Sequence, residues 1–163
     1  MTREIPLHGR HGDGRVALVD DADYERLSAF RWSVEANGYA AYSHGTDFVK
    51  MHRLILGLVK GDGLKVDHVN RDPLDNRKAN LRIATKSQNA ANMQRSRYRG
   101  RPKSGKYKGV EVDRRTGLRI SARIMVRGER RYLGAFQSER DAALAYDAAA
   151  REAFGEFART NFP

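Results

Sequence analysis

Hydrophobic and polar positions alternate most regularly between Leu118 and Val126, where the even-numbered side chains are apolar and the odd-numbered ones are mostly charged or polar. A period of two residues is typical of a strand with one buried face. Residues 107–113 and 130–136 also read as strands, and turn-forming residues separate all three segments. The pattern therefore predicts three consecutive strands joined by short turns.

An alanine-rich segment follows these strands directly. Ser138 is a good N-cap, residues 139–154 have high helix propensity, and Gly155 can end the helix. One apolar face of the predicted sheet would pack on this helix, which leaves an arginine-rich face exposed. The sequence thus predicts a three-stranded antiparallel sheet packed on one C-terminal helix, within an α+β fold.

The first half of the chain predicts shorter elements and a small β-rich part. Strands are expected at residues 3–6, 15–19, 32–34, 39–42 and 48–51, and short helices at residues 24–30 and 52–58. Asn37-Gly38 is a dipeptide typical of a tight hairpin turn. The aromatic side chains of Trp32, Tyr39 and Tyr42 are expected to form a small core, and an aromatic platform for bases is the alternative.

The stretch from Val66 to Met93 combines polar residues in an order that suggests chemistry. A short apolar strand ends at Asp67-His68, and an Asp-Pro pair then breaks the chain, because proline fixes its own backbone and restricts its predecessor. After a second short strand, Thr85 can cap a helix that carries Asn89 in its first turn. Strand, loop and helix together would bring the aspartate, the histidine and this asparagine near one another.

These three side chains have complementary chemistry. A carboxylate and an amide oxygen suit a hard divalent cation that keeps some of its waters. A neutral imidazole beside them can take a proton from water. The alternative is a turn-rich scaffold without catalysis, because Asp-His pairs are common and asparagine side chains stabilise turns.

With Asp67-His68, Asn76, Asn80-Leu81-Arg82, Thr85 and Asn89 in this order, the stretch resembles the HNH (His-Asn-His) endonucleases in the form carried by phage and intron homing enzymes. The resemblance implies a ββα-metal finger over residues 66–93 that holds one Mg²⁺ (or Mn²⁺) ion and cuts a phosphodiester bond in DNA. It implies roles for five residues: His68 as general base, Asn80 as the residue that pins the loop, Lys86 as a phosphate contact, and Asp67 and Asn89 as metal ligands. His52-Arg53 stands where this family has a His-Arg pair, so packing under the finger and a part in catalysis are both open for His52.

Composition narrows the choice of partner. The 163 residues fit one domain or two small ones, and the net charge is +11. Residues 95–131 contain 14 basic and 3 acidic side chains, so the excess charge lies in one block, which is typical of a region that binds a polyanion.

The absence of cysteine excludes disulfides and cysteine-type zinc sites. Because the sequence shows neither a signal peptide nor a long apolar run, we expect a cytoplasmic protein without membrane contact, in a bacterial host cell if the phage resemblance holds.

Residues 107–163 resemble the Apetala-2/ethylene-response-factor (ERF) DNA-binding domain. The matching residues are Tyr107-Lys108-Gly109-Val110, Tyr132-Leu133-Gly134-Ala135-Phe136, the run from Ala142 to Ala150, Gly155 and Asn161-Phe162-Pro163. The resemblance implies that the sheet binds the major groove. Glu111 and Asp113 replace arginines of the plant domain, so its sequence preference is not implied, and Glu111 would either accept from a cytosine or pair with Arg123.

Basic side chains before and within this segment are the predicted DNA contacts. Residues 95–106 alternate them with glycine, proline and serine, and are expected to be either a tether or a linker that follows phosphates. The predicted contacts are Arg99, Arg101, Lys103, Lys106, Lys108, Arg119, Arg123, Arg130 and Tyr132.

Together these patterns predict an endonuclease domain over residues 1–94, a basic linker over 95–106 and a DNA-binding domain over 107–163. The expected function is a metal-dependent, site-preferring endonuclease of the homing type that acts on double-stranded DNA. With one finger per chain, a monomer would nick one strand, and cutting both would need a DNA-dependent dimer or two events. The alternatives are a non-catalytic, sequence-specific DNA-binding regulator with a degenerate finger and an RNA-binding module.

Overall fold

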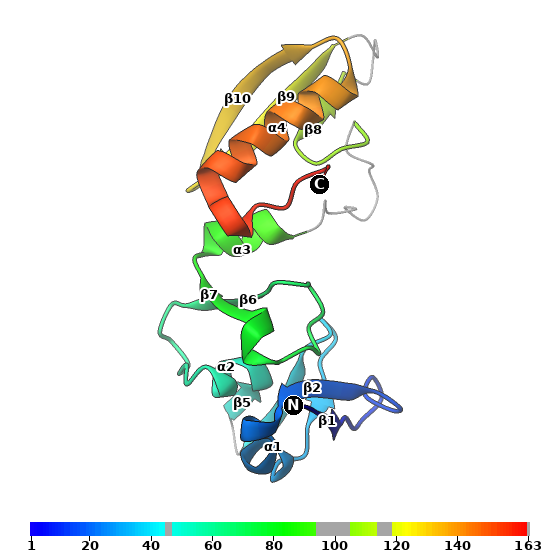
Figure 1. Ribbon diagram of the computed structural model, residues 1–163, viewed down its shortest axis with the longest axis vertical. Helices are drawn as coiled ribbons and strands as arrows, with labels where there is room; N and C mark the ends of the chain where they lie inside the picture. Colours follow the sequence, from blue (N-terminus) through cyan, green and yellow to red (C-terminus); the bar gives the residue numbers. More distant parts are fainter. Residues whose placement is uncertain (45–46, 94–104, 114–118, 163) are drawn as a thin grey trace. The chain divides into compact units, whose positions relative to one another are not determined.

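The computed structural model shows a mixed α+β fold, as predicted (Figure 1). The residues that it describes are 1–44, 47–93, 105–113 and 119–162. The chain divides into two compact units, Met1–Ala84 and Thr85–Pro163. The predicted boundary at residues 94 and 95 stays a prediction, because the expected linker lies almost entirely outside the described residues.

The first unit is built from short strands and helices. Its elements are β1 (Thr2–Pro6), β2 (Val16–Asp20), α1 (Asp21–Ser28), β3 (Ser33–Val34), β4 (Ala40–His44), β5 (Asp47–Lys50), α2 (Met51–Ile55), β6 (Lys65–His68), the 3-10 helix η1 (Lys78–Asn80) and β7 (Leu81–Ala84). The strands pair in antiparallel fashion as β1 with β2, as β3-β4-β5, and as β6 with β7. Every strand predicted before residue 60 is present, and each helix begins within a few residues of its predicted start.

The core of the first unit is centred on Trp32, which is fully buried. Its Nε1 donates a hydrogen bond to Leu27 O at 2.7 Å, and its ring centroid lies 4.9 Å from that of Tyr42. The predicted aromatic core is therefore confirmed for Trp32 and Tyr42. Tyr39 differs, because its ring packs on two histidines, described below, instead of on Trp32.

The second unit contains the predicted sheet and helix. Its elements are α3 (Lys86–Asn92), β8 (Val110–Val112), β9 (Ile120–Val126), β10 (Glu129–Phe136), α4 (Glu139–Phe154) and η2 (Gly155–Phe157). The antiparallel strands lie in the order β10-β9-β8, and α4 packs on one face of the sheet (Figure 1). Ala122, Ile124 and Val126 are buried, which confirms the predicted alternation in β9. Ser138 accepts a hydrogen bond from Asp141 N at 3.1 Å and caps α4 as predicted.

The first strand of this sheet is shorter than predicted, because residues 107–109 form a turn. Gly109 has a φ of 79°, a conformation that suits glycine. A Cβ atom at this position would lie 1.9 Å from Cδ2 of Tyr146 on α4. Glycine therefore allows the close approach between this turn and α4. Among the described residues, no helix has the length and apolar character needed to span a membrane.

Candidate active site

The predicted site begins on the hairpin of β6 and β7. Across this ladder Asp67 is paired with Arg82, and His68 with Leu81. Val66 and Leu81 are buried in the core of the first unit, which fixes the face that the hairpin turns inward. Residues 69–80 form the loop between the two strands and carry Asn76 and Asn80, two of the polar residues singled out in the sequence.

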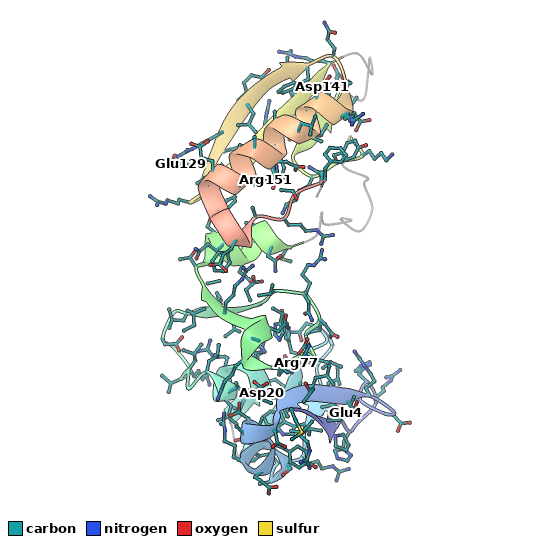
Figure 2. The ribbon with its side chains drawn as sticks, in the orientation of Figure 1. Glu4, Asp20, Arg77, Glu129, Asp141 and Arg151 are labelled. Carbon is teal, nitrogen blue, oxygen red and sulfur yellow. The ribbon has the colours of Figure 1, made fainter. Side chains whose placement is uncertain are left out.

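This loop is held against β2 by the backbone. Leu18 N donates to Leu74 O at 2.8 Å, and Asn76 N donates to Leu18 O at 2.8 Å. Asp20, at the end of β2, lies near Arg77 of the loop (Figure 2). The core strand β2 therefore determines where the loop lies, so the loop is not positioned by its own sequence alone.

Asn80 ties the two ends of the loop together. Its side chain is 8% exposed, its Nδ2 donates to Asp75 O at 2.7 Å, and its Oδ1 accepts from Asn70 N at 2.9 Å. Buried polar side chains in such positions stabilise a loop because they satisfy backbone groups that would otherwise be unpaired. Asn80 thus pins the loop, whereas its place in the catalytic group stays a prediction.

Asp75 is a central residue of the loop that the sequence reasoning missed. It is 2% exposed, and its carboxylate accepts from Nε and Nη2 of Arg77, both at 2.7 Å, and from Asn70 Nδ2 at 2.7 Å. The hydrogen bond from Arg77 holds the pKa of the Asp75 carboxyl below its usual range. The only sequence signal was an aspartate two residues before an arginine within a polar turn.

His68, the predicted general base, lies at the end of β6 and is 5% exposed. Its Nε2 lies 3.5 Å from Oδ1 of Asn76, a contact that favours the tautomer with the proton on Nε2. Burial lowers the pKa of His68 below its ordinary value, and the Asn76 contact and nearby carboxylates oppose this only in part. The imidazole is therefore neutral at pH 7, the state in which it can accept a proton.

A second histidine packs directly against this base. The rings of His52 and His68 have centroids 5.2 Å apart and planes at 90°, and the Tyr39 ring lies 5.0 Å from His52. His52 is 5% exposed, and its Nδ1 has no hydrogen-bond partner among the described residues. Burial, followed by repulsion from His68 when that ring is protonated, lowers the pKa of His52 to about 3. The structure thus shows the packing role that the sequence left open for His52.

This buried neutral histidine predicts a pH-dependent stability. Between pH 6.5 and about 3 the unfolded chain binds a proton at His52 that the folded chain does not, so the free energy of unfolding falls as the pH falls. From pH 7 to pH 5 the wild type should lose about 2 kcal/mol more than His52→Phe, which has no proton to bind. Urea unfolding at both pH values measures this difference, with the exposed His11→Phe as control. Equal losses in wild type and His52→Phe would contradict the burial argument.

Asp67, a predicted metal ligand, is engaged in an ion pair. Its Oδ2 accepts from Arg82 Nε at 2.9 Å and lies 2.8 Å from Arg82 Nη2. No local pattern in the sequence indicates this pair, although Arg82 belongs to the motif that carries the family resemblance.

The donor chemistry fits a divalent cation. The Asp67 carboxylate and the Asn89 amide oxygen are hard oxygen ligands, as Mg²⁺ prefers. In the part of the chain that the structure describes, no three histidine, aspartate or glutamate side chains are grouped to hold a metal. A cation bound by Asp67 would share its carboxylate with Arg82, and a joint site with Asn89 stays a prediction.

The helix that carries Asn89 and Lys86 begins where the sequence predicts. Thr85 Oγ1 accepts from Gln88 N at 3.2 Å and Gln88 Oε1 accepts from Thr85 N at 2.8 Å, which forms a reciprocal capping box. This helix, α3, belongs to the second compact unit, whereas the β6–β7 hairpin belongs to the first. The meeting of Asn89 with the hairpin and the phosphate contact of Lys86 therefore stay predictions.

The predicted DNA contacts near the linker have different outcomes. Arg99, Arg101 and Lys103 lie outside the described residues. Lys106 is exposed, with Nζ 5.5 Å from the centroid of Tyr107. Lys108 is half-buried: its Nζ donates to the carbonyl oxygens of Ala91 and, at 3.0 Å, Met93, and burial lowers its pKa to about 8. Lys108 thus stabilises the C-terminal end of α3, where a cation is favoured, and its contact with DNA stays a prediction.

The remaining predicted contacts share the sheet face opposite α4. They are Arg119, Arg123, Arg130 and Tyr132. Glu111 lies among them: it pairs with Arg130, and its Oε2 is 3.5 Å from Arg123 Nε. The Arg123 guanidinium lies 5.6 Å from the centroid of the Tyr132 ring. The structure therefore brings the predicted side chains to one face and shows the arginine pairing that the sequence left open for Glu111.

Comparison with known proteins gives matches to the hairpin region and to nearly the whole chain. A model of a family described as HNH endonuclease matches residues 49–91, which include α2 as well as the β6–β7 hairpin. Over 159 residues the chain is 30% identical to a protein of Acanthamoeba polyphaga mimivirus named "Uncharacterized HNH endonuclease L560". The alignment covers 95% of this chain and 79% of the viral protein.

Proposed function

Because the chain belongs to the HNH endonuclease family, we propose that it is a metal-dependent DNA endonuclease in which His68 is the general base. The observation that carries this proposal is the state of His68: buried, neutral at pH 7, oriented by Asn76, and within the segment that the family model matches. Nucleases of this family typically use a divalent metal. We infer Mg²⁺ or Mn²⁺ for this chain from its oxygen donors.

The chemistry of the hairpin follows from the tautomer of His68. With the proton on Nε2, the lone pair on Nδ1 takes a proton from the attacking water, whose oxygen forms a bond to phosphorus while the bond to the 3′ oxygen breaks. The leaving 3′ oxygen takes a proton from solvent and His68 returns its proton to solvent, so the products are a 5′ phosphate and a 3′ hydroxyl. Asn80 and Asp75 keep the loop in place during this step, so little conformational entropy is lost from the loop when DNA binds.

A bound divalent cation would stabilise the negative charge that develops on the phosphate. Asp67 and Asn89 are the residues that would hold it, and Lys86 would add a positive charge near the same phosphate. Replacement of either ligand should therefore weaken Mn²⁺ binding, measured as free Mn²⁺ by electron paramagnetic resonance, and should slow plasmid cleavage about 100-fold. Asp67→Asn, Asn89→Ala and the exposed-turn control Asn37→Ala form the series. Wild-type cleavage by both ligand variants would refute the assignment.

The Asp67–Arg82 ion pair also favours a second candidate function. A carboxylate that is already neutralised by an arginine attracts a cation less strongly, as expected for a regulator with a degenerate finger. Such a protein would bind duplex DNA without cutting it. Retention of His68 in a neutral, buried state is our reason to prefer the endonuclease.

We further propose that the exposed sheet face of the second unit binds duplex DNA and gives the enzyme a preferred site. The proposal rests on the clustering of Arg119, Arg123, Arg130 and Tyr132 on this face, together with the resemblance to the ERF domain. A monomer with one finger would nick one strand, so a double-strand break would need a dimer on DNA or two events.

Replacing the three arginines with alanine tests the sheet face. The triple variant should bind duplex DNA at least tenfold more weakly, and its salt dependence should decrease by about 0.9 in slope for each phosphate that the variant no longer binds. Fluorescence anisotropy of a labelled duplex over a range of KCl concentrations measures both quantities. Arg140→Ala, an exposed arginine of α4, is the matched control. Equal affinity of the triple variant and the control would place DNA binding elsewhere.

A further inference from the structure

Arg71 has a backbone conformation that L side chains rarely adopt. Its φ is 67°, in the left-handed region that glycine and asparagine favour. The turn is fixed by hydrogen bonds on both sides: Arg71 N donates to His68 O at 2.9 Å, and Asp72 N donates to Asn70 Oδ1 at 2.9 Å. Arg71 is therefore held rigidly, three residues after the proposed general base.

The side chain of Arg71 contributes nothing visible to the fold. It is exposed, and in the described part of the chain its guanidinium has no hydrogen bond or ion pair. The two other arginines of the hairpin and its loop are both ion-paired, Arg77 with Asp75 and Arg82 with Asp67. The nearest carboxylate in sequence, that of Asp72, accepts from Leu74 N at 2.9 Å inside the turn. A glycine would suit this turn better, so the arginine has no structural reason to be here.

We propose that Arg71 binds a phosphate of the DNA backbone next to the phosphodiester whose hydrolysis His68 assists as general base. A strained residue at a functional site indicates that the side chain is needed there, and an unpaired guanidinium has the planar donor geometry that binds a phosphate through two hydrogen bonds. The hydrogen bond from Arg71 N to His68 O holds the Arg71 backbone beside that of His68. The inference rests on the proposed endonuclease function.

The test uses substitutions in which stability and function should change in opposite directions. Arg71→Gly removes the charge and relieves the backbone, so its melting temperature should equal or exceed that of the wild type. Its rate of single-turnover plasmid nicking should fall about tenfold, as expected when a charged hydrogen-bonding group is removed. Arg71→Lys keeps the charge and should retain most of the rate.

Arg127→Gly is the matched control, because Arg127 also is exposed and has a positive φ, 51°, in the turn between β9 and β10. It removes the same charge from the same kind of turn, and at saturating protein its nicking rate should equal that of the wild type. Binding is compared in a His68→Ala background, where Arg71→Gly should lower the salt slope by about one.

The possible outcomes separate this inference from the function on which it rests. If His68→Ala cuts as fast as the wild type, the endonuclease mechanism itself is wrong. If His68→Ala is inactive but Arg71→Gly nicks and binds like the wild type, only the phosphate contact of Arg71 is wrong. A lower melting temperature for Arg71→Gly would show that the arginine stabilises the turn and would also overturn the inference.

Discussion

Replacing His68 with alanine is expected to reduce DNA cleavage by about 10²–10⁴-fold, because no other group in the hairpin takes the proton from water. His52, the nearest imidazole, has its pKa lowered to about 3 and is a much weaker base. DNA affinity should stay nearly unchanged, since the ring is 5% exposed and offers little surface to the duplex. Single-turnover nicking of a supercoiled plasmid measures the rate, and anisotropy of a labelled duplex measures the affinity.

His11→Ala is the control for this experiment, because His11 is an exposed histidine of the first unit. Circular dichroism of both variants checks that the first unit remains folded. If the His68→Ala protein is folded, binds DNA and nicks at the wild-type rate, His68 is not the general base. Loss of both cleavage and binding would instead indicate that His68 supports the fold.

The second large effect concerns the stability of the second unit and not its chemistry. Asp147 on α4 is fully buried, and its carboxylate accepts from Asn161 N and Nδ2, both at 2.8 Å, and from Phe162 N at 3.0 Å. Asn161 in turn accepts from Lys108 N at 2.7 Å. Asp147 thus joins the C-terminal segment to the turn that precedes β8.

Asp147→Ala should lower the free energy of unfolding of the second unit by about 3 kcal/mol or more, because it leaves several buried N–H groups without an acceptor. Asp147→Asn should lower it less, since one side-chain oxygen remains. Asp141→Ala, an exposed aspartate in the first turn of the same helix, should cost about 1 kcal/mol or less. Urea unfolding followed by circular dichroism gives the three values. A destabilisation of the same size for Asp141→Ala would contradict this role of Asp147.

Much of the second unit could be predicted because its signals are local. The alternation in β9, the Ser138 cap and the alanine-rich run of α4 each depend on neighbouring residues, and the structure confirms all three. Lys108 shows the limit of such reasoning. Its charge suggested a DNA contact, but the carbonyl groups that it meets lie 15 and 17 residues earlier in the chain.

The candidate site likewise has some features that the local sequence predicts and others that depend on contacts between distant segments. The order of Asp67, His68 and Asn80 was sufficient to indicate the family, because the motif is read along the chain. The Asp67–Arg82 pair and the Asp75 network depend on strand register and on the contact with β2, which no local pattern in the sequence contains. The hairpin register of β6 and β7 would have revealed the first of these pairs.

The central claim is that His68 cuts DNA with the help of a divalent cation held by Asp67 and Asn89. The most direct measurement is incubation of supercoiled plasmid with the purified protein in Mg²⁺, in Mn²⁺ and in EDTA. We predict nicked circles in the presence of either metal and intact plasmid in EDTA. A folded protein that binds the plasmid but leaves it supercoiled in both metals would contradict the claim and favour a DNA-binding regulator.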